Sequence, residues 1–472
     1  MKPGERPKKN FGSRFVVLGL GVSGFFACKA LFQKGFCNVI AYDDQELEKS
    51  KPGIYRELRS LGCRVVCGRE GIAELLGELS AGDTVIVSPG VPLNHPGVLE
   101  AGKRGLEVIG ELEWAWRNLE PRVPVVAVTG TNGKTTTTEL IGSVCREYFG
   151  ADRVFVGGNI GEPLSSFICK PEASVDVIVL EVSSFQLDTA KSFSPRVAVV
   201  LNISEDHLDR YDSFDSYARS KMSVAWKAVS SGGRAVLNGD DPVIVRYAPD
   251  RGCLFWTGRS RKGDAVISAS ALRLFPGTSE EWIFDFSRAR VLGRHNHENF
   301  AAAALCCFLL GIPTGCIERV FTEFRPGSHR LEWVGSWKGI DFYDDSKATN
   351  VDATVKALEA FDRPLWLLVG GRDKGGSYDK LVQAAKLKCR GVLCFGEARD
   401  RIYGFFENCG FEVTKVEDLE EAFLVSLRKA RPGDIVLLSP ACSSFDRYRN
   451  YAERGDHFKA LVKNLIEGKP GS

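Results

Sequence analysis

The residues with the clearest chemical meaning lie in TGTNGKTTTT (residues 129–138), between the apolar run VPVVAV and a helix-like segment. Glycines and a lysine between a buried strand and a helix are typical of a phosphate-binding loop, because backbone N–H groups surround phosphate oxygens at a helix N-terminus. In such a loop Lys134 neutralises phosphate charge and the hydroxyl of Thr135 binds magnesium. The spacing departs from the usual loop, since Gly130 stands three residues before Gly133 instead of five.

A carboxylate ends the next buried strand of this region. Glu181 closes the run VDVIVLE, and a carboxylate at a strand end beside a phosphate loop is suited to bind magnesium. The alternative is a solvated carboxylate or a helix cap, but the position one strand after the loop favours the metal. His207 in NISEDHLDRY and Lys221 in YARSK are harder to interpret, because a single histidine is usually structural and a single lysine usually a surface charge.

The first glycine-rich segment, GLGVSG (residues 19–24), stands directly after a strand and before a helix, with Asp43 and Asp44 ending the following strand. This context is the dinucleotide-binding fingerprint and by itself suggests a nicotinamide dehydrogenase. The glycines also suit a sheet that uses them only for close packing. A third reading is a different diphosphate, such as that of a UDP-sugar, because a helix N-terminus does not distinguish one diphosphate from another.

These motifs require a scaffold of alternating strands and helices. Continuous apolar runs that end in Gly, Asp or Ser, such as RFVVLGL, VDVIVLEV and PLWLLVGG, are typical of parallel strands buried on both faces. The sequence therefore predicts an α/β fold with ligands at the carboxyl ends of strands. Proline-containing breaks at LEPRVPVV and FRPGSHRLEW predict three domains, at residues 1–121, 122–327 and 328–472.

Composition limits the classes of function. The chain has 472 residues, 26% of them charged, with a net charge of +2, so it lacks the basic surplus of nucleic-acid-binding proteins. The printed sequence holds no run of 18 or more apolar residues and no recognisable signal peptide, so we expect neither membrane insertion nor export. We expect a cytoplasmic monomer.

A set of motifs in one order along the chain resembles the Mur ligase family. The motifs are TGTNGKT, LEVSSFQL, NISEDHLDRY followed by YARSK, GRHNHEN, SHRLE, DDSKATN and SPACSSFDRYRNYAERGDHF. Folylpolyglutamate synthetases and the other amino-acid-adding Mur ligases share the general plan and remain the alternatives within this class. The SSFQL, DDSKATN and SPACSSFD versions are most similar to the member that adds D-glutamate.

The resemblance implies both a fold and a reaction. The fold is an N-terminal Rossmann-like domain, a central phosphate-loop ATPase-type domain and a C-terminal Rossmann-like domain. The substrates are UDP-N-acetylmuramoyl-L-alanine and D-glutamate, with ATP and magnesium at two sites. The precursor's carboxylate attacks the γ-phosphate of ATP, and the amine of D-glutamate then attacks the resulting acyl phosphate. The third domain is expected to close on the second and exclude water.

The same resemblance implies the following residues for each role. Expected at the ATP site are Gly130, Thr131, Asn132, Gly133, Lys134, Thr135, Thr136, Asn296, Asn299, Arg330 and Asp345. Expected to act in catalysis are Lys134, Glu181, His207 and Lys221, with Thr135, Glu181, His207 and a carbamylated Lys221 as metal ligands. Expected at the UDP-linked substrate are Val22, Ser23, Asp43, Ser88, Gly90, Asn159 and His207. Expected at D-glutamate are Lys347, Thr349, Lys374, Ser444, Phe445 and Tyr451.

Two rivals from other classes make different predictions. A nucleotide-binding regulatory protein with the same loop predicts ATP hydrolysis without ligation. A nicotinamide dehydrogenase leaves the loop at Gly130 to Thr135 without a purpose. One departure from the family pattern concerns the first domain, where Gln45 stands at a position that is often basic.

Overall fold

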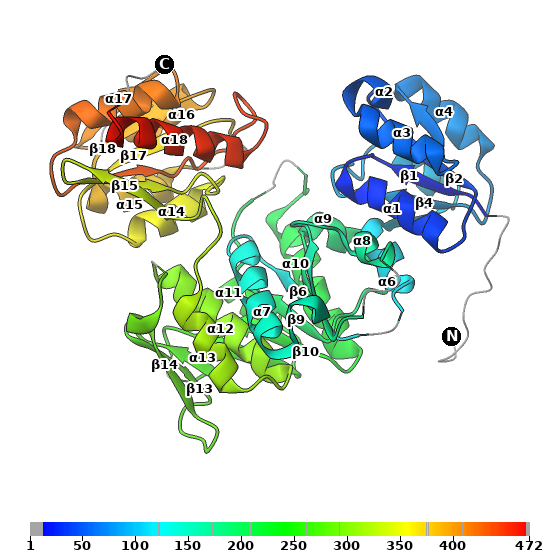
Figure 1. Cartoon of the computed structure of the whole chain (residues 1–472), viewed down its shortest axis with the longest axis horizontal. Coiled ribbons are helices and arrows are strands. Elements are labelled where there is room, and N and C mark those ends of the chain that lie inside the picture. The colour runs from blue at the N-terminus through cyan, green and yellow to red at the C-terminus, as the bar shows by residue number, and fades with distance from the viewer. Residues whose placement is uncertain are drawn as a thin grey trace.

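The computed structural model describes residues 13–120, 123–170, 174–206, 210–260, 262–291, 293–373, 375, 377–407 and 409–468. Within these ranges the strands form three sheets, one in each of three consecutive α/β domains (Figure 1). The predicted fold class is therefore confirmed. No helix in the described ranges combines the length and the apolar character that crossing a membrane requires.

The N-terminal domain holds a parallel sheet of order β3-β2-β1-β4-β5. Its order reverses between β1 and β4, so a crevice opens there at the carboxyl ends of the strands. Its strands are β1 (Phe15–Leu18), β2 (Val39–Asp43), β3 (Arg64–Cys67), β4 (Thr84–Val87) and β5 (Glu107–Gly110). Its helices are α1 (Val22–Gln33), α2 (Leu47–Ser50), α3 (Pro52–Ser60), α4 (Arg69–Glu78), α5 (Pro96–Lys103) and α6 (Glu111–Arg117).

The central domain holds a sheet of order β14-β13-β12-β11-β10-β9-β6-β8-β7, parallel from β7 to β12 and antiparallel beyond. Because β6 lies between β8 and β9, the segments that follow these three strands meet at one edge. The strands are β6 (Val125–Thr129), β7 (Val154–Gly158), β8 (Val177–Glu181), β9 (Val197–Val200), β10 (Arg234–Asn238), β11 (Cys253–Thr257), β12 (Ala265–Ile267), β13 (Ala271–Leu274) and β14 (Trp282–Asp285). The helices are α7 (Lys134–Phe149), α8 (Leu164–Ile168), α9 (Ser184–Asp188), α10 (Phe214–Ser230), α11 (Pro242–Tyr247), α12 (Arg294–Leu309) and α13 (Thr314–Glu323), with 3₁₀ turns η1 (Ala151–Arg153) and η2 (Phe286–Arg288).

The C-terminal domain holds a sheet of order β15-β16-β20-β17-β18-β19, in which only the edge strand β15 is antiparallel to its neighbour. The strands are β15 (Glu332–Trp337), β16 (Ile340–Asp344), β17 (Leu365–Gly370), β18 (Cys389–Phe395), β19 (Glu412–Lys415) and β20 (Ile435–Leu438). The helices are α14 (Val351–Glu359), α15 (Asp379–Lys388), α16 (Arg399–Phe406), α17 (Leu419–Lys429) and α18 (Tyr451–Ile466).

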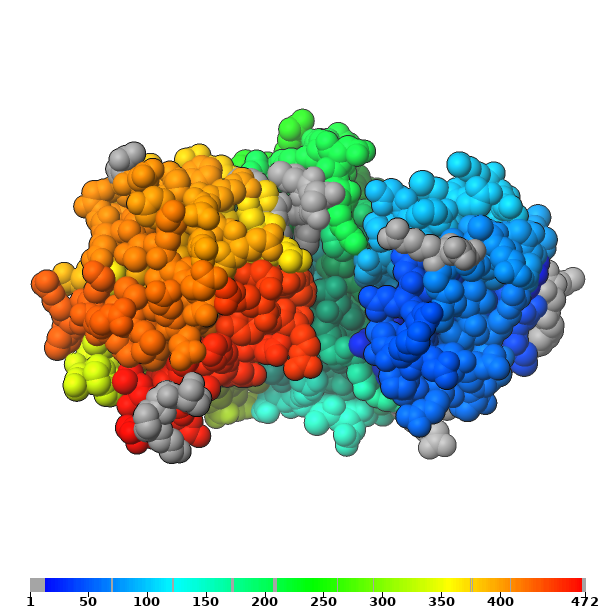
Figure 2. Space-filling view, turned by 90° about the horizontal axis from the view of Figure 1, so that it is seen from above, coloured from blue at the N-terminus to red at the C-terminus, as the bar shows by residue number. Residues whose placement is uncertain are grey.

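The domains are joined in two different ways. The N-terminal and central domains share one continuous apolar cluster, in which α1 packs against α8. The C-terminal domain has apolar clusters of its own residues. In the space-filling view the two outer domains stand on either side of the central domain, with a groove between them (Figure 2). The N-terminal joint is thus a shared core, and burial of apolar surface resists its opening.

A buried arginine holds together the strand ends of the C-terminal domain. Arg454 of α18 is fully buried, and its guanidinium donates hydrogen bonds to the hydroxyl (3.0 Å) and the carbonyl (2.9 Å) of Ser346 and to the carbonyl of Cys442 (3.1 Å). Burial lowers the pKa of Arg454 to about 10, so it remains charged at neutral pH. Ser346 follows β16 and Cys442 follows β20, so this one side chain fixes both strand ends.

We predict that Arg454→Leu destabilises this domain, because buried carbonyls lose a charged donor. The expected loss in the free energy of unfolding is about 3 kcal/mol, since hydrogen bonds to charged groups are worth roughly 1.5–3 kcal/mol each. Amide hydrogen exchange of peptides from β16 and β20 measures it, with exchange about a hundredfold faster expected. Arg449→Leu is the control, because Arg449 is exposed and pairs with Glu453 at the surface. Unchanged exchange in Arg454→Leu contradicts the prediction.

Candidate active site

The loop after β6 leads directly into the N-terminus of α7. Gly133 is the residue before α7 and has φ 83°, a left-handed conformation that favours glycine. A Cβ atom on Gly133 would also lie 2.5 Å from the Asn299 side-chain oxygen. No side chain caps this helix start. The N–H groups of the first turn and the positive end of the helix dipole are therefore available to an anion.

Two lysines converge on one carbonyl of this loop. The ammonium of Lys134 donates to the carbonyls of Gly130 (2.9 Å) and Thr131 (2.8 Å). The ammonium of Lys221, from α10, also donates to the Gly130 carbonyl, at 2.8 Å. Burial lowers the pKa of both lysines, and the charge of Lys134 lowers that of Lys221 further. The structure thus gathers two of the four expected catalytic residues around Gly130.

Glu181, at the end of β8, lies across from the start of α7. Its carboxylate accepts hydrogen bonds from the Thr135 hydroxyl (2.7 Å) and from the Asn159 amide (2.8 Å), and it is only 3% exposed. A hydroxyl and a carboxylate are the hard oxygen donors that magnesium prefers, so the pair formed by Thr135 and Glu181 fits this ion. Asn159 reaches the same carboxylate from the segment after β7.

A small cavity of about 90 Å³ separates the central and C-terminal domains beside the loop. Seven residues expected at the ATP site line it: Asn132, Gly133, Thr136, Asn296, Asn299, Arg330 and Asp345. The cavity is narrow because side chains of both domains border it, among them Asn296 of the central domain and Asp345 of the C-terminal domain.

The walls of this cavity hold titratable groups in unusual states. Burial raises the pKa of Asp345 to about 7, while its oxygens accept hydrogen bonds from Ser439 Oγ (2.8 Å) and the Leu331 N–H (3.2 Å). Burial also lowers the pKa of His295 to about 3, so its ring is neutral. Sequence reasoning missed His295 and Lys356 as cavity residues. The GRHNHEN motif was a signal for His295, whereas nothing local marked Lys356.

Polar contacts join the C-terminal domain to the phosphate loop. The side-chain amide of Asn132 donates to the Asp352 carboxylate at 2.9 Å, and that of Asn350 donates to the Asn132 side-chain oxygen at 3.2 Å. Ser204, after β9, also donates to Asp352 at 3.3 Å. These part-buried hydrogen bonds are polar contacts, whereas the other joint is a shared apolar core.

The residues expected at D-glutamate are only partly brought together. Lys347 lines the small cavity, with its ammonium 3.7 Å from the centre of the Tyr451 ring, and burial lowers its pKa to about 8. Thr349 lines a different cavity of about 290 Å³. Ser444 is buried, and Phe445 is 61% exposed. Lys374 lies outside the described residues, as does His207 of the catalytic set.

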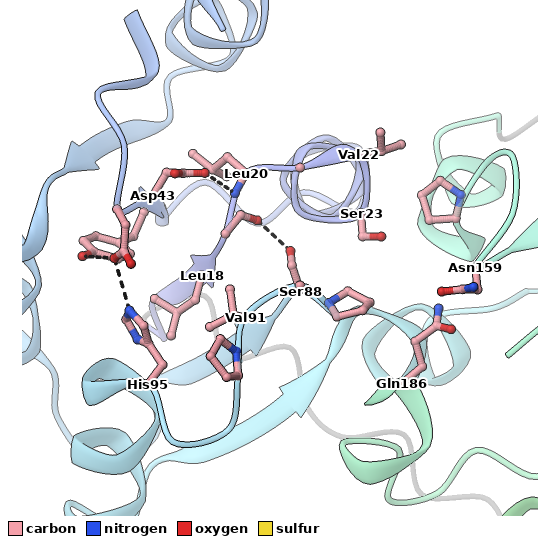
Figure 3. A pocket seen from close by; sticks show the side chains of 18 of the residues that line it. Leu18, Leu20, Val22, Ser23, Asp43, Ser88, Val91, His95, Asn159 and Gln186 are labelled. Atoms are coloured by element: carbon pink, nitrogen blue, oxygen red, sulfur yellow. Dashed lines mark hydrogen bonds and ion pairs between the residues drawn. The ribbon is translucent and has the colours of Figure 1, made fainter. Parts of the chain in front are cut away.

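A larger cavity, of about 500 Å³, lies between the N-terminal and central domains (Figure 3). Six residues expected at the UDP-linked substrate line it: Val22, Ser23, Asp43, Ser88, Gly90 and Asn159. Its floor is the glycine turn, where a Cβ atom on Gly24 would lie 2.0 Å from the Gly19 carbonyl oxygen. The Ser88 hydroxyl closes the turn by donating to the same carbonyl at 2.6 Å.

Asp43 lines this cavity and also makes structural contacts that the sequence did not predict. Its carboxylate accepts the N–H of Leu20 (2.8 Å) and the N–H of Gln45 (3.0 Å), so it shapes the glycine turn. The neighbouring Asp44 lines the cavity together with Tyr42, His95 and Gln186. Sequence reasoning noted Asp44 as part of the glycine-rich fingerprint but missed Tyr42, His95 and Gln186 as cavity residues. Asp44 had a signal in its position after a strand, whereas His95 belongs to a loop without a motif.

Comparisons with known proteins agree with the architecture. Three family descriptions match: "Mur ligase MurD-like, N-terminal domain" over residues 13–110, "Mur ligase middle domain" over 128–307, and "Mur ligase, glutamate ligase domain" over 329–442. A solved MurF ligase from Thermotoga maritima, in complex with ADP, superposes with a TM-score of 0.60 at 17% identity, covering 98% of this chain and 100% of that chain. This structural likeness shows the fold alone.

Two curated relatives extend over nearly the whole chain, and both are named UDP-N-acetylmuramoylalanine--D-glutamate ligase. The protein from Desulfosudis oleivorans is 39% identical over 98% of this chain and 99% of its own length. The protein from Desulfatibacillum aliphaticivorans is 38% identical over 96% of this chain and 99% of its own length. Together with the matched domains, this similarity shows that the chain belongs to the Mur ligase family, as its motifs predicted.

Proposed function

We propose that this chain joins D-glutamate to UDP-N-acetylmuramoyl-L-alanine in peptidoglycan precursor synthesis, with conversion of ATP to ADP and phosphate. The observation that carries the proposal is the position of Asn159. It lines the large cavity and donates to Glu181, which in turn accepts from Thr135 of the phosphate loop. A substrate in that cavity therefore reaches the nucleotide phosphates through one continuous set of side chains. The names of the full-length relatives support the choice of D-glutamate.

Different residues serve different steps of the reaction. A carboxylate is a poor electrophile, so it must first gain a leaving group. Its oxygen attacks the γ-phosphorus of ATP, the bond to ADP breaks, and the amine of D-glutamate then displaces phosphate from the acyl phosphate. Lys134 and the N-terminus of α7 offset the negative charge that gathers on the phosphates. Asn159 orients the carboxylate of the precursor, and approach of the C-terminal domain excludes water from the acyl phosphate.

Magnesium fits the donors present. Bound magnesium offsets phosphate charge and polarises the phosphoryl oxygens. Thr135 and Glu181 hold the first ion. Lys221, in its carbamylated form, and His207 serve the second. A carbamate suits this place because burial lowers the Lys221 pKa well below its ordinary value, and the neutral amine is the form that reacts with carbon dioxide.

The adenosine part of ATP and D-glutamate remain to be placed, and both lie on the side of the C-terminal domain. Adenine and ribose lie against Asn296, Asn299, Arg330 and Asp345. Two lysines and hydroxyl groups suit the carboxylates of D-glutamate, which lies among Lys347, Thr349, Lys374, Ser444, Phe445 and Tyr451. We also propose domain boundaries after residues 121 and 327, which lie between the matched regions 13–110, 128–307 and 329–442. The enzyme acts as a cytoplasmic monomer without a nucleic-acid partner.

The function is tested by phosphate release from ATP in the presence of magnesium and UDP-N-acetylmuramoyl-L-alanine. D-glutamate, L-glutamate, L-alanine or diaminopimelate is added in turn, and the ligated product is identified by mass. We expect phosphate and product with D-glutamate alone, in keeping with the names of the full-length relatives. Release that does not depend on an amino acid indicates a nucleotide-binding regulatory protein instead.

Glu181→Gln is predicted to weaken magnesium binding, because an amide carries no charge to offset that of the ion. The magnesium concentration for half-maximal activity should rise at least about tenfold, as disturbed metal sites typically lose 10–100-fold in affinity. A magnesium titration of steady-state activity measures this. Glu147→Gln serves as the control, because Glu147 pairs with Arg319 at the surface. Equal titration curves for Glu181→Gln and the parent rule out Glu181 as a metal ligand.

Carbamylation of Lys221 predicts a carbonyl signal in carbon NMR after incubation with ¹³C-bicarbonate. Lys221→Arg should abolish the signal, because a guanidinium stays protonated, and should lower kcat by about a hundredfold through the lost metal ligand. Removal of carbon dioxide should inactivate the parent reversibly. Lys170→Arg is the matched control, since Lys170 is exposed and pairs with Glu162. A signal that survives in Lys221→Arg places the carbamate elsewhere.

A further inference from the structure

The large cavity has two chemically different ends. One end holds Asn159 and Gln186, on the side of the phosphate loop, and the glycine turn at the N-terminus of α1 occupies the middle. Since a helix N-terminus takes the diphosphate and the reacting carboxylate must face Asn159, the remaining end is left for the uridine. Tyr42, Asp43, Asp44 and His95 line the cavity away from Asn159. Asp43 and His95 mark this end in Figure 3.

The hydrogen bonds of His95 determine which ring nitrogen carries its proton. Nδ1 accepts the N–H of Gly97 at 3.1 Å and so caps the start of α5. A nitrogen that accepts a hydrogen bond carries no proton, so in the neutral ring the proton is on Nε2. Nε2 lies 3.2 Å from Oδ1 of Asp44 and therefore donates to that carboxylate. The backbone of α5 thereby aims a donor at Asp44.

Asp44 receives a second donor at the same oxygen. The Tyr42 hydroxyl donates to Oδ1 of Asp44 at 2.8 Å. Both donors are themselves held in place, since Tyr42 is only 1% exposed and the side chain of His95 is 12% exposed. The Asp44 side chain, in contrast, is 42% exposed and borders the cavity. Two fixed donors on one oxygen orient the carboxylate of an otherwise exposed aspartate.

The adjacent Asp43 also lines the cavity, but only 13% of its side chain is exposed, against 42% for Asp44. Both oxygens of Asp43 accept backbone N–H groups, from Leu20 and Gln45, and its direction is set by the glycine turn. Asp44 directly follows β2, where sheets of this type place the carboxylate that binds a nucleoside hydroxyl. Of the two carboxylates at the end of β2, Asp44 is thus the one more exposed to a ligand.

We propose that His95 is a positioning residue that fixes the Asp44 carboxylate at the uridine end of the cavity, where Asp44 accepts a hydrogen bond from the uridine group. The inference rests on the proposed UDP-linked substrate and adds a residue that contributes to its recognition. His95 does not touch the reacting atoms. Its loss should therefore change the KM for the UDP-linked substrate and leave kcat unchanged.

Two variants distinguish the positioning of Asp44 by His95 from its capping of α5. In His95→Asn the side-chain oxygen replaces Nδ1, so the Gly97 N–H keeps its cap, but no donor reaches Asp44. In His95→Gln the amide nitrogen stands at the position of Nε2, so Asp44 keeps its donor and the cap is lost. If His95 only caps α5, His95→Gln is the variant that loses UDP affinity. If His95 positions Asp44, His95→Asn is the variant that loses it.

The experiment measures steady-state kinetics and calorimetric binding of UDP alone to the full chain. We expect His95→Asn to raise the KM for the UDP-linked substrate and the Kd for UDP about tenfold, the usual loss for one hydrogen bond to a charged group. Values of kcat, and KM for ATP and D-glutamate, should stay as in the parent. His95→Gln should bind UDP within about threefold of the parent and melt at a lower temperature.

The opposite result overturns the proposal: His95→Gln loses UDP affinity while His95→Asn keeps it, or both variants match the parent. The parent enzyme separates this failure from that of the proposed function. If the parent binds no UDP and forms no product with the UDP-linked substrate, the function itself is wrong. If the parent is active and the variants do not differ as described, only the assignment of His95 falls.

Discussion

The carbonyl of Gly130 accepts hydrogen bonds from two lysines, and the electrostatics of the whole site follow from this contact. Two ammonium groups at one oxygen repel each other in a place where water cannot screen them. Burial and this repulsion lower the pKa of Lys221 well below that of an ordinary lysine. Such a site stabilises gathered anions, or a lysine that exchanges its positive charge for a carbamate. The proposed function uses both properties.

The parallel sheet makes this contact possible. Strands β6, β8 and β9 are neighbours and run in one direction, so the phosphate loop, Glu181 and the segment after β9 emerge at a single edge. The adjoining domains meet that edge through different interfaces. The N-terminal domain shares an apolar core with the central domain, while the C-terminal domain reaches the loop through amide and carboxylate contacts such as Asn132 to Asp352. The first interface is thus apolar and the second polar.

The two cavities differ for the same reason. The cavity beside the N-terminal domain is about 500 Å³ and bordered by a rigid joint, so its shape exists before a substrate arrives. The cavity beside the C-terminal domain is about 90 Å³ and lies next to polar contacts between the two domains. Asn159 connects the preformed cavity to Glu181 and the loop. The first cavity is thus framed by an apolar joint and the second by a polar one.

The sequence by itself determined the α/β class, the phosphate loop and the carboxylate at the end of β8, because apolar runs and the residues that directly follow them are local features. Several residues that it expected at the ligands, such as Ser88, Asn159 and Asp345, line the two cavities because they follow strands, and their roles stay predictions. The tertiary structure alone decided how these residues act. Asp43 is held by backbone N–H groups, Asp44 faces the cavity beside His95, and Lys347 lies at the small cavity against Tyr451. These facts depend on contacts between residues far apart in the chain, and spacing along a sequence does not encode such distances.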